Sequence, residues 1–532
     1  MRPSPWCFGS FVCLALHFLM PALHAEVPKD TLVQAYQIDD LITLDPAEVF
    51  EFSGAEYAAN VYDRLVTYPV DDVTKLQGHV AESWTIADDG KTYTFKIRPG
   101  ITFHSGNPLT AEDAAWSLQR VIKLNKTPSF ILTQFGFTPE NVDQRIRVID
   151  DETFEVELDK PYAPTFFLYC LTATVGSVVD KQLVMEHEQN GDMGHGWLRT
   201  ASAGSGPFQL RAWKPNESLI IEANHDYWGG APLLARVISR HIPESSTQLL
   251  LLEKGDVDIA RNLEADQLES LRDSPDINIK QVPKGAIYYL GLNQKNEYLA
   301  KPEVREALKW LVDYDGIANS LLKGSAVVHQ SFLPQGFLGA IDDKPYKLDV
   351  EKAKALLEQA GLQDGFHVTM DTRNATPLPE MAQVLQSDWA KAGIDLEILP
   401  GDNKQTLTKY RARTHDIYIG RWGPDYQDPH TNADTFASNP NNADDSGLTG
   451  KLAWRNAWEI PEMTAKTEAA VLEQDPAKRA EMYEEIQREH QKTSPFVIMF
   501  QDIEVIAERN NVAGTIWGPS FDDNKYWKAH KE

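Results

Sequence analysis

The chain has 532 residues and a formal net charge of −27, with 42% hydrophobic and 24% charged residues. This length allows two or three domains with sizeable cores. So acidic a chain repels nucleic-acid phosphates and anionic lipid surfaces, which argues against both as partners.

The N-terminus has the features of a secretory signal peptide. Arg2 precedes an apolar run that ends at about Leu23, and Ala25 stands before Glu26. This pattern predicts a signal peptide over residues 1–25, cleaved after Ala25, because the run is too short for a membrane span of about 20 apolar residues. Cys7 and Cys13 would leave with it. The remaining Cys170 has no partner for an intramolecular disulfide, and we expect it to be a small buried hydrophobe.

Alternating strands and amphipathic helices follow along the chain. Residues 92–97 ("TYTFKI") and 153–158 ("TFEVEL") alternate like half-buried strands. The later elements are predicted helices at 302–313, 349–361, 381–393 and 475–489, and predicted strands at 394–399 and 496–500. Helices alternate with strands from about residue 285 onward, which favours an α/β domain. The first half is richer in strands and turns.

Several segments, in order along the chain, carry a family resemblance. They are "AESWTIADDGKTYTFKIRPGITFHSGNPLTAEDAAWSLQR" (81–120), "GSGPFQLRAW" (204–213), "DYWGG" (226–230), "LLEKGDVDIA" (251–260), "VREALKWLVDYDGI" (304–317) and "AKALLEQAG" (353–361). Together they closely resemble the periplasmic oligopeptide/dipeptide-binding proteins of ABC importers (solute-binding protein family 5, cluster C). Within the first segment we expect Trp84, Phe95 and Phe103 to be core residues, Asp89-Gly90 to form a hairpin turn, and His104 to make structural hydrogen bonds.

The resemblance implies an α/β, two-lobed periplasmic binding protein fold (type II, cluster C) with an extra small domain inserted in the first lobe. Lobe I would comprise residues 26–70, 196–285 and 489–532, the small domain residues 71–195, and lobe II residues 286–488. The chain would cross between the lobes near 285–293 and 494–500, and the lobes would close around a ligand as other periplasmic binding proteins do.

The function implied is that of a periplasmic receptor, a monomer without a cofactor. It would bind di- or oligopeptides and deliver them to an inner-membrane ABC permease with cytoplasmic ATPase subunits. Alternatives are the same receptor fold for a nickel chelate, an opine or an oligosaccharide, an envelope chaperone, or a secreted hydrolase. No nucleophile elbow, P-loop or zinc signature occurs in the sequence, so we expect no enzymatic activity.

The segment "GRWGPDYQDP" (420–429) is the main candidate for the binding site. From residue types alone, its two acids suit an acid/base pair, a metal, a cationic group or only a turn. The resemblance implies that Asp425 holds a peptide ammonium, with Trp422 and Tyr426 as neighbouring walls. We expect Asp428 to form a turn with Pro429.

Three further residues are candidate ligand contacts. A peptide carboxylate suits the bidentate fork of an arginine, and related dipeptide-binding proteins keep an arginine near the place of Arg373. Tyr36 and Asp39 lie in "AYQIDDLITLDPA" (35–47), which resembles the N-terminal cleft edge of the family.

A rival metal site is suggested by "MEHEQNGDMGHGW" (185–197), which contains His187, Glu188, Asp192, Met193 and His195. A zinc-protease H-E-x-x-H motif would need histidine at position 191, where this chain has glycine. We therefore expect a polar surface loop and no metal.

Overall fold

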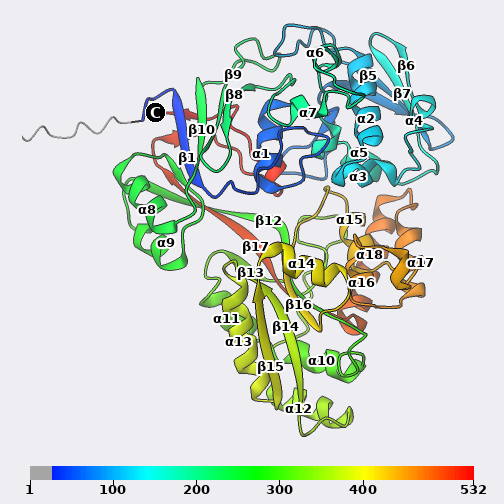
Figure 1. Cartoon of the computed structure of the whole chain (residues 1–532), viewed down its shortest axis with the longest axis vertical. Helices are drawn as coiled ribbons and strands as arrows, with labels where there is room; N and C mark the ends of the chain where they lie inside the picture. The colour runs from blue at the N-terminus through cyan, green and yellow to red at the C-terminus, as the bar shows by residue number, and fades with distance from the viewer. Residues whose placement is uncertain (1–26) are drawn as a thin grey trace, which may run out of the picture.

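The computed structural model describes residues 27–532, apart from the side chain of Asn403. The predicted signal peptide, with Cys7 and Cys13, lies outside the described residues. The molecule has an upper part, which holds both ends of the described chain, and a lower part, residues 302–493. Two long strands connect the two parts (Figure 1). In residues 27–532 no helix has the length and apolar character needed to cross a membrane.

An eleven-stranded sheet runs through both parts. In the described chain its order is β15-β14-β16-β12-β17-β11-β1-β10-β9-β8, with β13 paired to β17. The strands are β1 (Thr31–Tyr36), β8 (Phe208–Lys214), β9 (Ser218–Ala223), β10 (Arg236–His241), β11 (Ile259–Ala260), β12 (Ile277–Leu292), β13 (Ala326–Val328), β14 (Phe366–Arg373), β15 (Ile394–Gly401), β16 (Ile417–Trp422) and β17 (Phe496–Arg509). Parallel and antiparallel pairs are mixed, as in many α/β folds.

The strands β12 and β17 connect the two parts as an antiparallel pair (Figure 1). Their register shifts between Pro283 and Ile287, where proline has no N–H to donate to the ladder. In this interruption the Lys284 ammonium donates to the Gly518 carbonyl at 2.6 Å and to Asn524 Oδ1 at 3.0 Å. The irregular stretch of β12 is therefore anchored to the upper part just before the strand enters the lower one.

The lower part is built from helices packed on its strands. In the helix predicted at 302–313, the apolar stripe of Val304, Ala307, Leu308 and Leu311 is fully buried. The side chain of Asp349 caps the helix that begins at Val350 by accepting from the Lys352 N–H at 3.0 Å. The helices are α10 (Pro302–Trp310), α11 (Tyr314–Asn319), α12 (Val350–Gln359), α13 (Leu378–Ala390), α14 (Asn403–Arg411), α15 (His430–Phe436), α16 (Leu452–Arg455), α17 (Pro461–Ala470) and α18 (Pro476–Thr493).

A separate sheet of order β4-β5-β7-β6 forms the centre of a small domain within the upper part. Phe95 and Phe103 are buried in its core and Cys170 is buried as well, but Trp84 is only half-buried at the edge. The turn at Gly90 has φ +68°, as the Asp89-Gly90 pair predicted. The elements are β4 (Ala81–Ile86), β5 (Thr92–Ile97), α2 (Ala111–Leu124), α3 (Phe130–Thr133), α4 (Val142–Arg145), β6 (Ile146–Asp150), β7 (Thr153–Glu157) and α5 (Pro164–Cys170).

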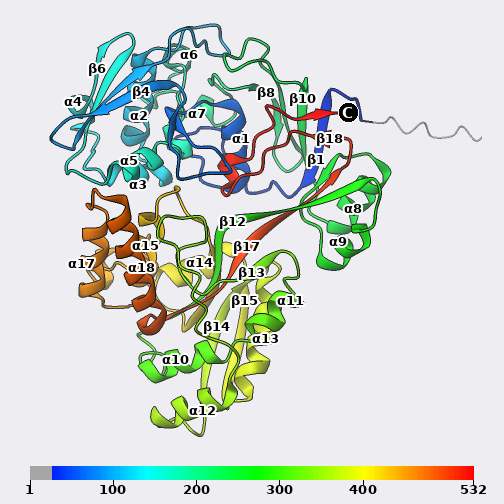
Figure 2. The same cartoon turned by 180° about the vertical axis from the view of Figure 1, so that it is seen from behind.

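The end of the chain returns to the upper part (Figure 2). β17 pairs with β11, and the Lys531 ammonium lies 2.7 Å from the Asp258 carboxylate. The remaining helices and strands are α1 (Phe52–Val61), β2 (Val66–Thr67), β3 (Gln77–Gly78), α6 (Lys181–Glu186), α7 (His195–Leu198), α8 (Ser245–Lys254), α9 (Ala265–Leu271), β18 (Val512–Ala513) and β19 (His530–Lys531), with short 3₁₀ turns η1 (Thr127–Ser129), η2 (Thr174–Gly176), η3 (Asp444–Ser446) and η4 (Phe521–Asp523).

Each part has its own hydrophobic core. One core lies in the small domain, two pack on the remaining upper sheet, and two more flank the strands of the lower part. The predicted α/β fold with two lobes and an extra small domain is therefore confirmed. The residue numbers at which the domains meet stay a prediction.

Candidate ligand-binding site

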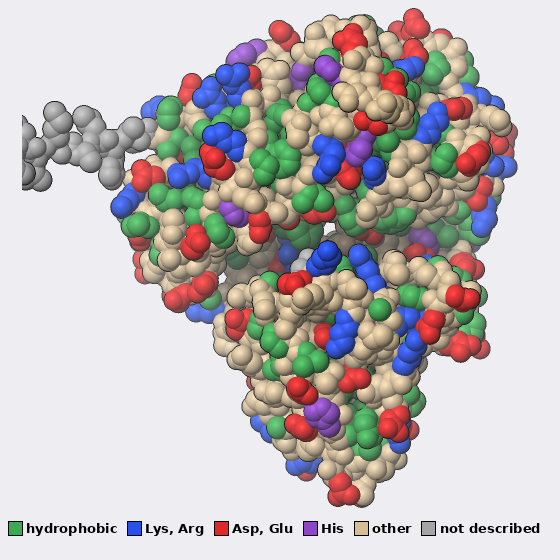
Figure 3. All heavy atoms as spheres, in the orientation of Figure 1, with side chains coloured by type: hydrophobic (Ala, Val, Ile, Leu, Met, Phe, Trp, Pro, Cys, Tyr) green, Lys and Arg blue, Asp and Glu red, His purple; other side chains and the backbone are tan. Residues whose placement is uncertain are grey.

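The segment 420–429 lies where the lower part faces the upper one. It comprises the end of β16, a loop over residues 423–429, and the approach to α15. The space-filling view is hollowed between the two parts, and basic side chains lie along the lower rim of this hollow (Figure 3). Loops at the carboxyl ends of strands are the usual place for a ligand in an α/β sheet.

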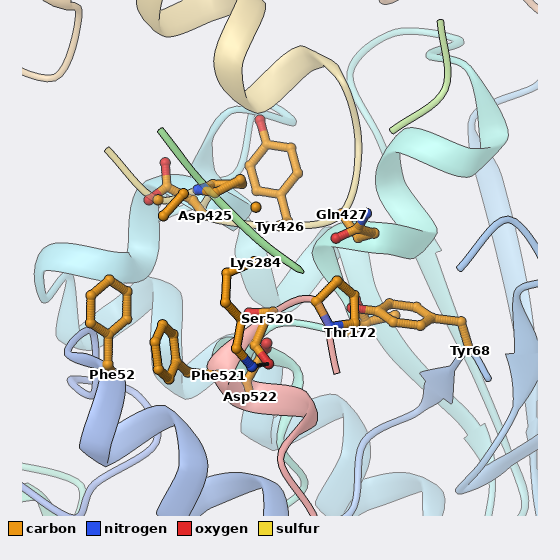
Figure 4. A pocket seen from close by; sticks show the side chains of 15 residues that line it. Phe52, Tyr68, Thr172, Lys284, Asp425, Tyr426, Gln427, Ser520, Phe521 and Asp522 are labelled. Carbon is orange, nitrogen blue, oxygen red and sulfur yellow. Dashed lines mark hydrogen bonds between the residues drawn. The ribbon is translucent and has the colours of Figure 1, made fainter. Parts of the chain in front are cut away.

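A small cavity of about 30 Å³ lies against this loop. We call it the first chamber. Loop 423–427, the irregular stretch of β12, α1 and the C-terminal segment all contribute to its wall, so both parts of the molecule line it (Figure 4). Its lining residues are Phe52, Tyr68, Thr172, Lys284, Gly285, Ala286, Gly423, Pro424, Asp425, Tyr426, Gln427, Pro519, Ser520, Phe521 and Asp522.

Asp425 presents a carboxylate without a counter-charge. Its Oδ2 lies 3.5 Å from the Thr431 hydroxyl, and its backbone N–H donates to the same hydroxyl at 3.1 Å. Within residues 27–532 no lysine, arginine or histidine nitrogen forms an ion pair with it. Burial raises the pKa of Asp425 to about 7, with smaller effects from Thr431 and Asp434. A cation next to this half-buried carboxylate would stabilise its ionised form.

Of the two predicted aromatic walls, Tyr426 lines the first chamber and Trp422 does not. Tyr426 lines the first chamber, yet its ring is only 7% exposed and packs 5.8 Å from Phe166 in the small domain. Trp422 does not line the chamber. It packs against the lower part and donates from Nε1 to Asn432 Oδ1 at 3.3 Å.

Asp428 is held inside the protein. Its Oδ1 accepts the His430 N–H at 2.9 Å, which is the turn that the sequence predicted. Both carboxylate oxygens also accept from the Arg479 guanidinium, each at 2.7 Å, and both side chains are fully buried. This bidentate pair was not predicted. It leaves Asp428 unavailable as the second carboxylate of an acid/base pair.

A second chamber of about 260 Å³ lies beside the first and shares Phe52 and Phe521 with it. Tyr36 lines it and lies under the Arg261 guanidinium, 4.3 Å from the ring centroid. Arg421, from the candidate segment, lines it too. The full set is Tyr36, Gln37, Asp40, Phe52, Ser53, Glu56, Arg261, Asn262, Leu263, Tyr288, Ser325, Arg421, Asp502, Ile503, Glu504, Val505 and Phe521.

Arg373 and Asp39 line neither chamber. Arg373 is the last residue of β14, half-buried and paired in register with Gly401 of β15. Asp39 is exposed and accepts a hydrogen bond from the Gln37 side chain at 3.2 Å. The structure therefore brings Asp425 and Tyr426 together in one chamber and Tyr36 into the next, and leaves Trp422, Arg373 and Asp39 outside both.

A buried charge network supports the two chambers and was not predicted. Arg261 lies 2.8 Å from the Glu56 carboxylate, and Lys284 lies 3.0 Å from Glu504. Burial alone would raise the pKa of Glu504, but Arg261 and Lys284 lower it to about 2. The sequence contains one indication of this network. Lys284 is a charged residue beside Pro283, at the start of a long apolar run.

The rival metal segment 185–197 is a surface loop whose polar groups bind within the protein. Asp192 accepts three backbone N–H groups at 2.9 Å, His195 Nδ1 lies 2.9 Å from Asp45, and the His187 ring stacks on Trp197 at 4.2 Å. In the described part of the chain no group of three or more histidine, cysteine or acidic side chains is placed to hold a metal ion.

Comparison with known proteins decides the family. The model of the bacterial extracellular solute-binding proteins, family 5, matches residues 75–444. The chain belongs to this family. It is 30% identical to the probable D,D-dipeptide-binding periplasmic protein DdpA of Escherichia coli (strain K12), over 96% of both chains. It is 26% identical to the dipeptide-binding protein of the same strain, over 88% of this chain and 89% of that one.

A solved family 5 structure has the same fold. The periplasmic binding protein DppA from Helicobacter pylori, in complex with the peptide STSA, has a TM-score of 0.78 at 26% identity and covers 94% of this chain and 98% of its own. Members of family 5 are binding proteins rather than enzymes, and DdpA and the Helicobacter pylori protein are described as periplasmic. The resemblance inferred from the sequence motifs is thereby confirmed.

Proposed function

We propose that this family 5 protein is the periplasmic receptor of an ABC importer for di- or oligopeptides. It binds the peptide between its two parts and delivers it to membrane permease subunits, which work with cytoplasmic ATPases. The uncompensated carboxylate of Asp425 in a chamber lined by both parts carries the proposal. The peptide ligands in the names of the relatives support it.

Asp425 would bind the peptide ammonium, because burying that group without a partner charge is costly. The other predicted contacts, Arg373 for the carboxylate and Trp422, Tyr426, Tyr36 and Asp39 around the ligand, stay proposals. A neutral sugar would leave Asp425 without a counter-charge, so the observed site favours a cationic or zwitterionic ligand.

The proposal also includes the predicted processing and organisation of the chain. Cleavage after Ala25 would release a monomer with lobe I at 26–70, 196–285 and 489–532. The small domain at 71–195 and lobe II at 286–488 would complete it.

The ammonium role is tested with Asp425→Ala. We expect free-amine peptides to bind at least about 2 kcal/mol, roughly 30-fold, more weakly, since the ligand charge would lose its partner. Isothermal titration with free and N-acetylated forms of one peptide measures this, and the acetylated form should change little. Asp364→Ala removes an exposed acid of the lower part and serves as the matched control.

Equal losses for the free and acetylated peptides would contradict the ammonium role. Native mass spectrometry of protein isolated from the periplasm tests the ligand class directly. A co-purifying peptide is expected, and a sugar, an opine or a metal chelate in its place would overturn the proposal.

A further inference from the structure

The small domain touches the lower part on the side of the molecule away from α8 and α9 (Figures 1 and 2). Residues 161–166, where α5 begins, form the upper side of this contact. Residues 471–479, which join α17 to the first turn of α18, form the lower side. We call these two segments together the latch.

Hydrogen bonds cross the latch directly between the two parts. The Ala163 N–H donates to the Val471 carbonyl at 2.9 Å. The side-chain amide of Gln474 donates to the Pro161 carbonyl at 2.9 Å and to the Tyr162 carbonyl at 3.0 Å. Such bonds are exchanged for bonds to water when the parts separate, so each has a modest net worth and the latch can open.

Side chains of the lower part also complete the hydrophobic core of the small domain. Tyr426 and Val471 are 7% and 6% exposed, and both belong to the core that contains Phe166. The Phe166 ring lies 5.8 Å from the ring of Tyr426 and, edge-on, 4.9 Å from that of His430. Separation of the two parts would expose these apolar surfaces to water, so their burial favours the closed arrangement.

The latch supports the loop 423–429 that forms a wall of the first chamber. Tyr426 belongs to this loop, and its ring is held by the small domain. The Arg479 guanidinium donates from Nη1 to the Thr165 hydroxyl at 3.2 Å and to Asp428 Oδ2 at 2.7 Å. One side chain therefore joins the small domain to the far end of the loop.

Closure by the latch acts on every ligand alike. A ligand that contacts both parts binds the closed form better than the open one, and its apparent affinity is reduced by the fraction of protein that is not closed. The latch contacts are made between protein groups, and neither Phe166 nor Gln474 lines a chamber. Their contribution to closure is therefore independent of the ligand's chemistry.

We propose that the small domain holds the receptor closed through this latch. Phe166 and Gln474 are positioning residues, which fix the loop 423–429 and the closed arrangement without touching the ligand. The latch thereby raises the affinity for different ligands by one common factor. The inference rests on the proposed receptor function and assigns a role in closure to the small domain.

The first test measures affinity in variants of the latch. Val471→Asp places a charge against the core of the small domain, and we expect it to weaken binding of the free and N-acetylated forms of one peptide equally, by about tenfold or more. Gln474→Ala, at an exposed position, should weaken both by about fivefold. Leu472→Asp is the matched control, because Leu472 is 40% exposed, and it should change little.

The two forms of the peptide distinguish the latch from the ammonium site. Asp425→Ala should affect the free-amine form alone, whereas a latch variant should affect both. A loss confined to the free-amine form, or no loss in either latch variant, would overturn the latch. If urea unfolding shows that Val471→Asp is itself destabilised, Gln474→Ala decides alone.

The second test measures the distance between the two parts. Spin labels at Glu140→Cys in the small domain and Glu462→Cys on α17 occupy exposed positions, and the native Cys170 is buried and escapes labelling. Pulsed electron paramagnetic resonance without peptide should show a larger short-distance population in the wild type than in Val471→Asp. Saturating peptide should raise this population in both. Identical distributions without peptide would overturn the latch.

The outcomes separate this inference from the proposed function. If the wild type binds peptides and the latch variants bind them equally well, the latch is refuted and the receptor function stands. If the wild type binds no peptide, the proposed function fails, and the distance measurement without peptide still decides whether the small domain holds the two parts together.

Discussion

Asp425 and Asp428 lie three residues apart in one loop and meet opposite surroundings. Asp428 is fully buried against the Arg479 guanidinium and the His430 N–H. Asp425 is half-buried in a chamber wall, and among the described residues its carboxylate contacts only the Thr431 hydroxyl. Asp428 therefore has its charge neutralised by Arg479 and stabilises the loop. Asp425 has no counter-charge among the described residues and lies at the chamber wall.

The largest expected effect comes from removing the partner of Asp428. Arg479→Met should lower the free energy of unfolding by about 3–5 kcal/mol, because it leaves a buried carboxylate unpaired. Urea unfolding followed by tryptophan fluorescence measures the loss. Asp425→Asn at pH 8 should leave stability unchanged or raise it, because it removes a charge that has no partner. Similar losses of unfolding free energy in Arg479→Met and Asp425→Asn would mean that both acids contribute equally to stability.

The same pair can be removed as a unit. Asp428→Asn combined with Arg479→Met should recover part of the stability lost in Arg479→Met alone, since no unpaired charge then stays buried. The same urea series measures the recovery. A double variant no more stable than the single one would assign the loss to packing rather than to charge.

Acid should weaken ligand binding through Asp425. The carboxylate must be ionised to pair with an ammonium, and its pKa in the ligand-free protein is about 7. Affinity for a free-amine peptide should therefore fall by about tenfold per pH unit from pH 7 to pH 5. Titration calorimetry at several pH values measures this slope. An equal slope in Asp425→Asn would rule out Asp425 as its source.

The raised pKa of Asp425 also makes the folding stability depend on pH, and here acid stabilises rather than weakens. Asp425 ionises near pH 4 in the unfolded chain and near pH 7 in the folded one. Its contribution to stability is therefore greatest below pH 4 and is lost as the pH rises through 7. Melting temperatures of ligand-free wild type and Asp425→Asn should converge toward pH 5 and separate at pH 8, with the variant higher. A constant difference across this range would contradict the shift.

The smallest effect is expected at Asp39. Its carboxylate is exposed and lines neither chamber, so solvent screens any interaction with a ligand. Asp39→Asn should change peptide affinity by about threefold or less. A larger loss in the same titrations would place the N-terminal cleft edge in direct contact with the ligand.

The elements that the sequence predicted well are those with local causes. The buried stripe of α10, the Asp349 cap and the Gly90 turn each depend on residues a few positions apart. The helix predicted at 475–489 is present as α18, although it continues to Thr493 rather than ending at about Glu489.

The candidate site was predictable only in part. Asp425 was singled out through the family resemblance, because its residue type and spacing alone left a turn or a metal equally open. The Asp428–Arg479 pair spans 51 residues and the Phe52–Phe521 stack joins opposite ends of the chain. Such contacts arise from the folded topology and leave no periodic or motif signal in the sequence. Arg421 stands in the candidate segment of the sequence. The chamber that it lines forms only in the fold, where β12 and β17 pass between the two parts.

The wall of the first chamber depends on the last residues of the chain. Residues 519–522, within the last fourteen of the chain, complete that wall, and Lys284 is anchored to residues 518 and 524. A chain truncated before residue 518 would therefore lack one side of this chamber and both of the groups that anchor Lys284.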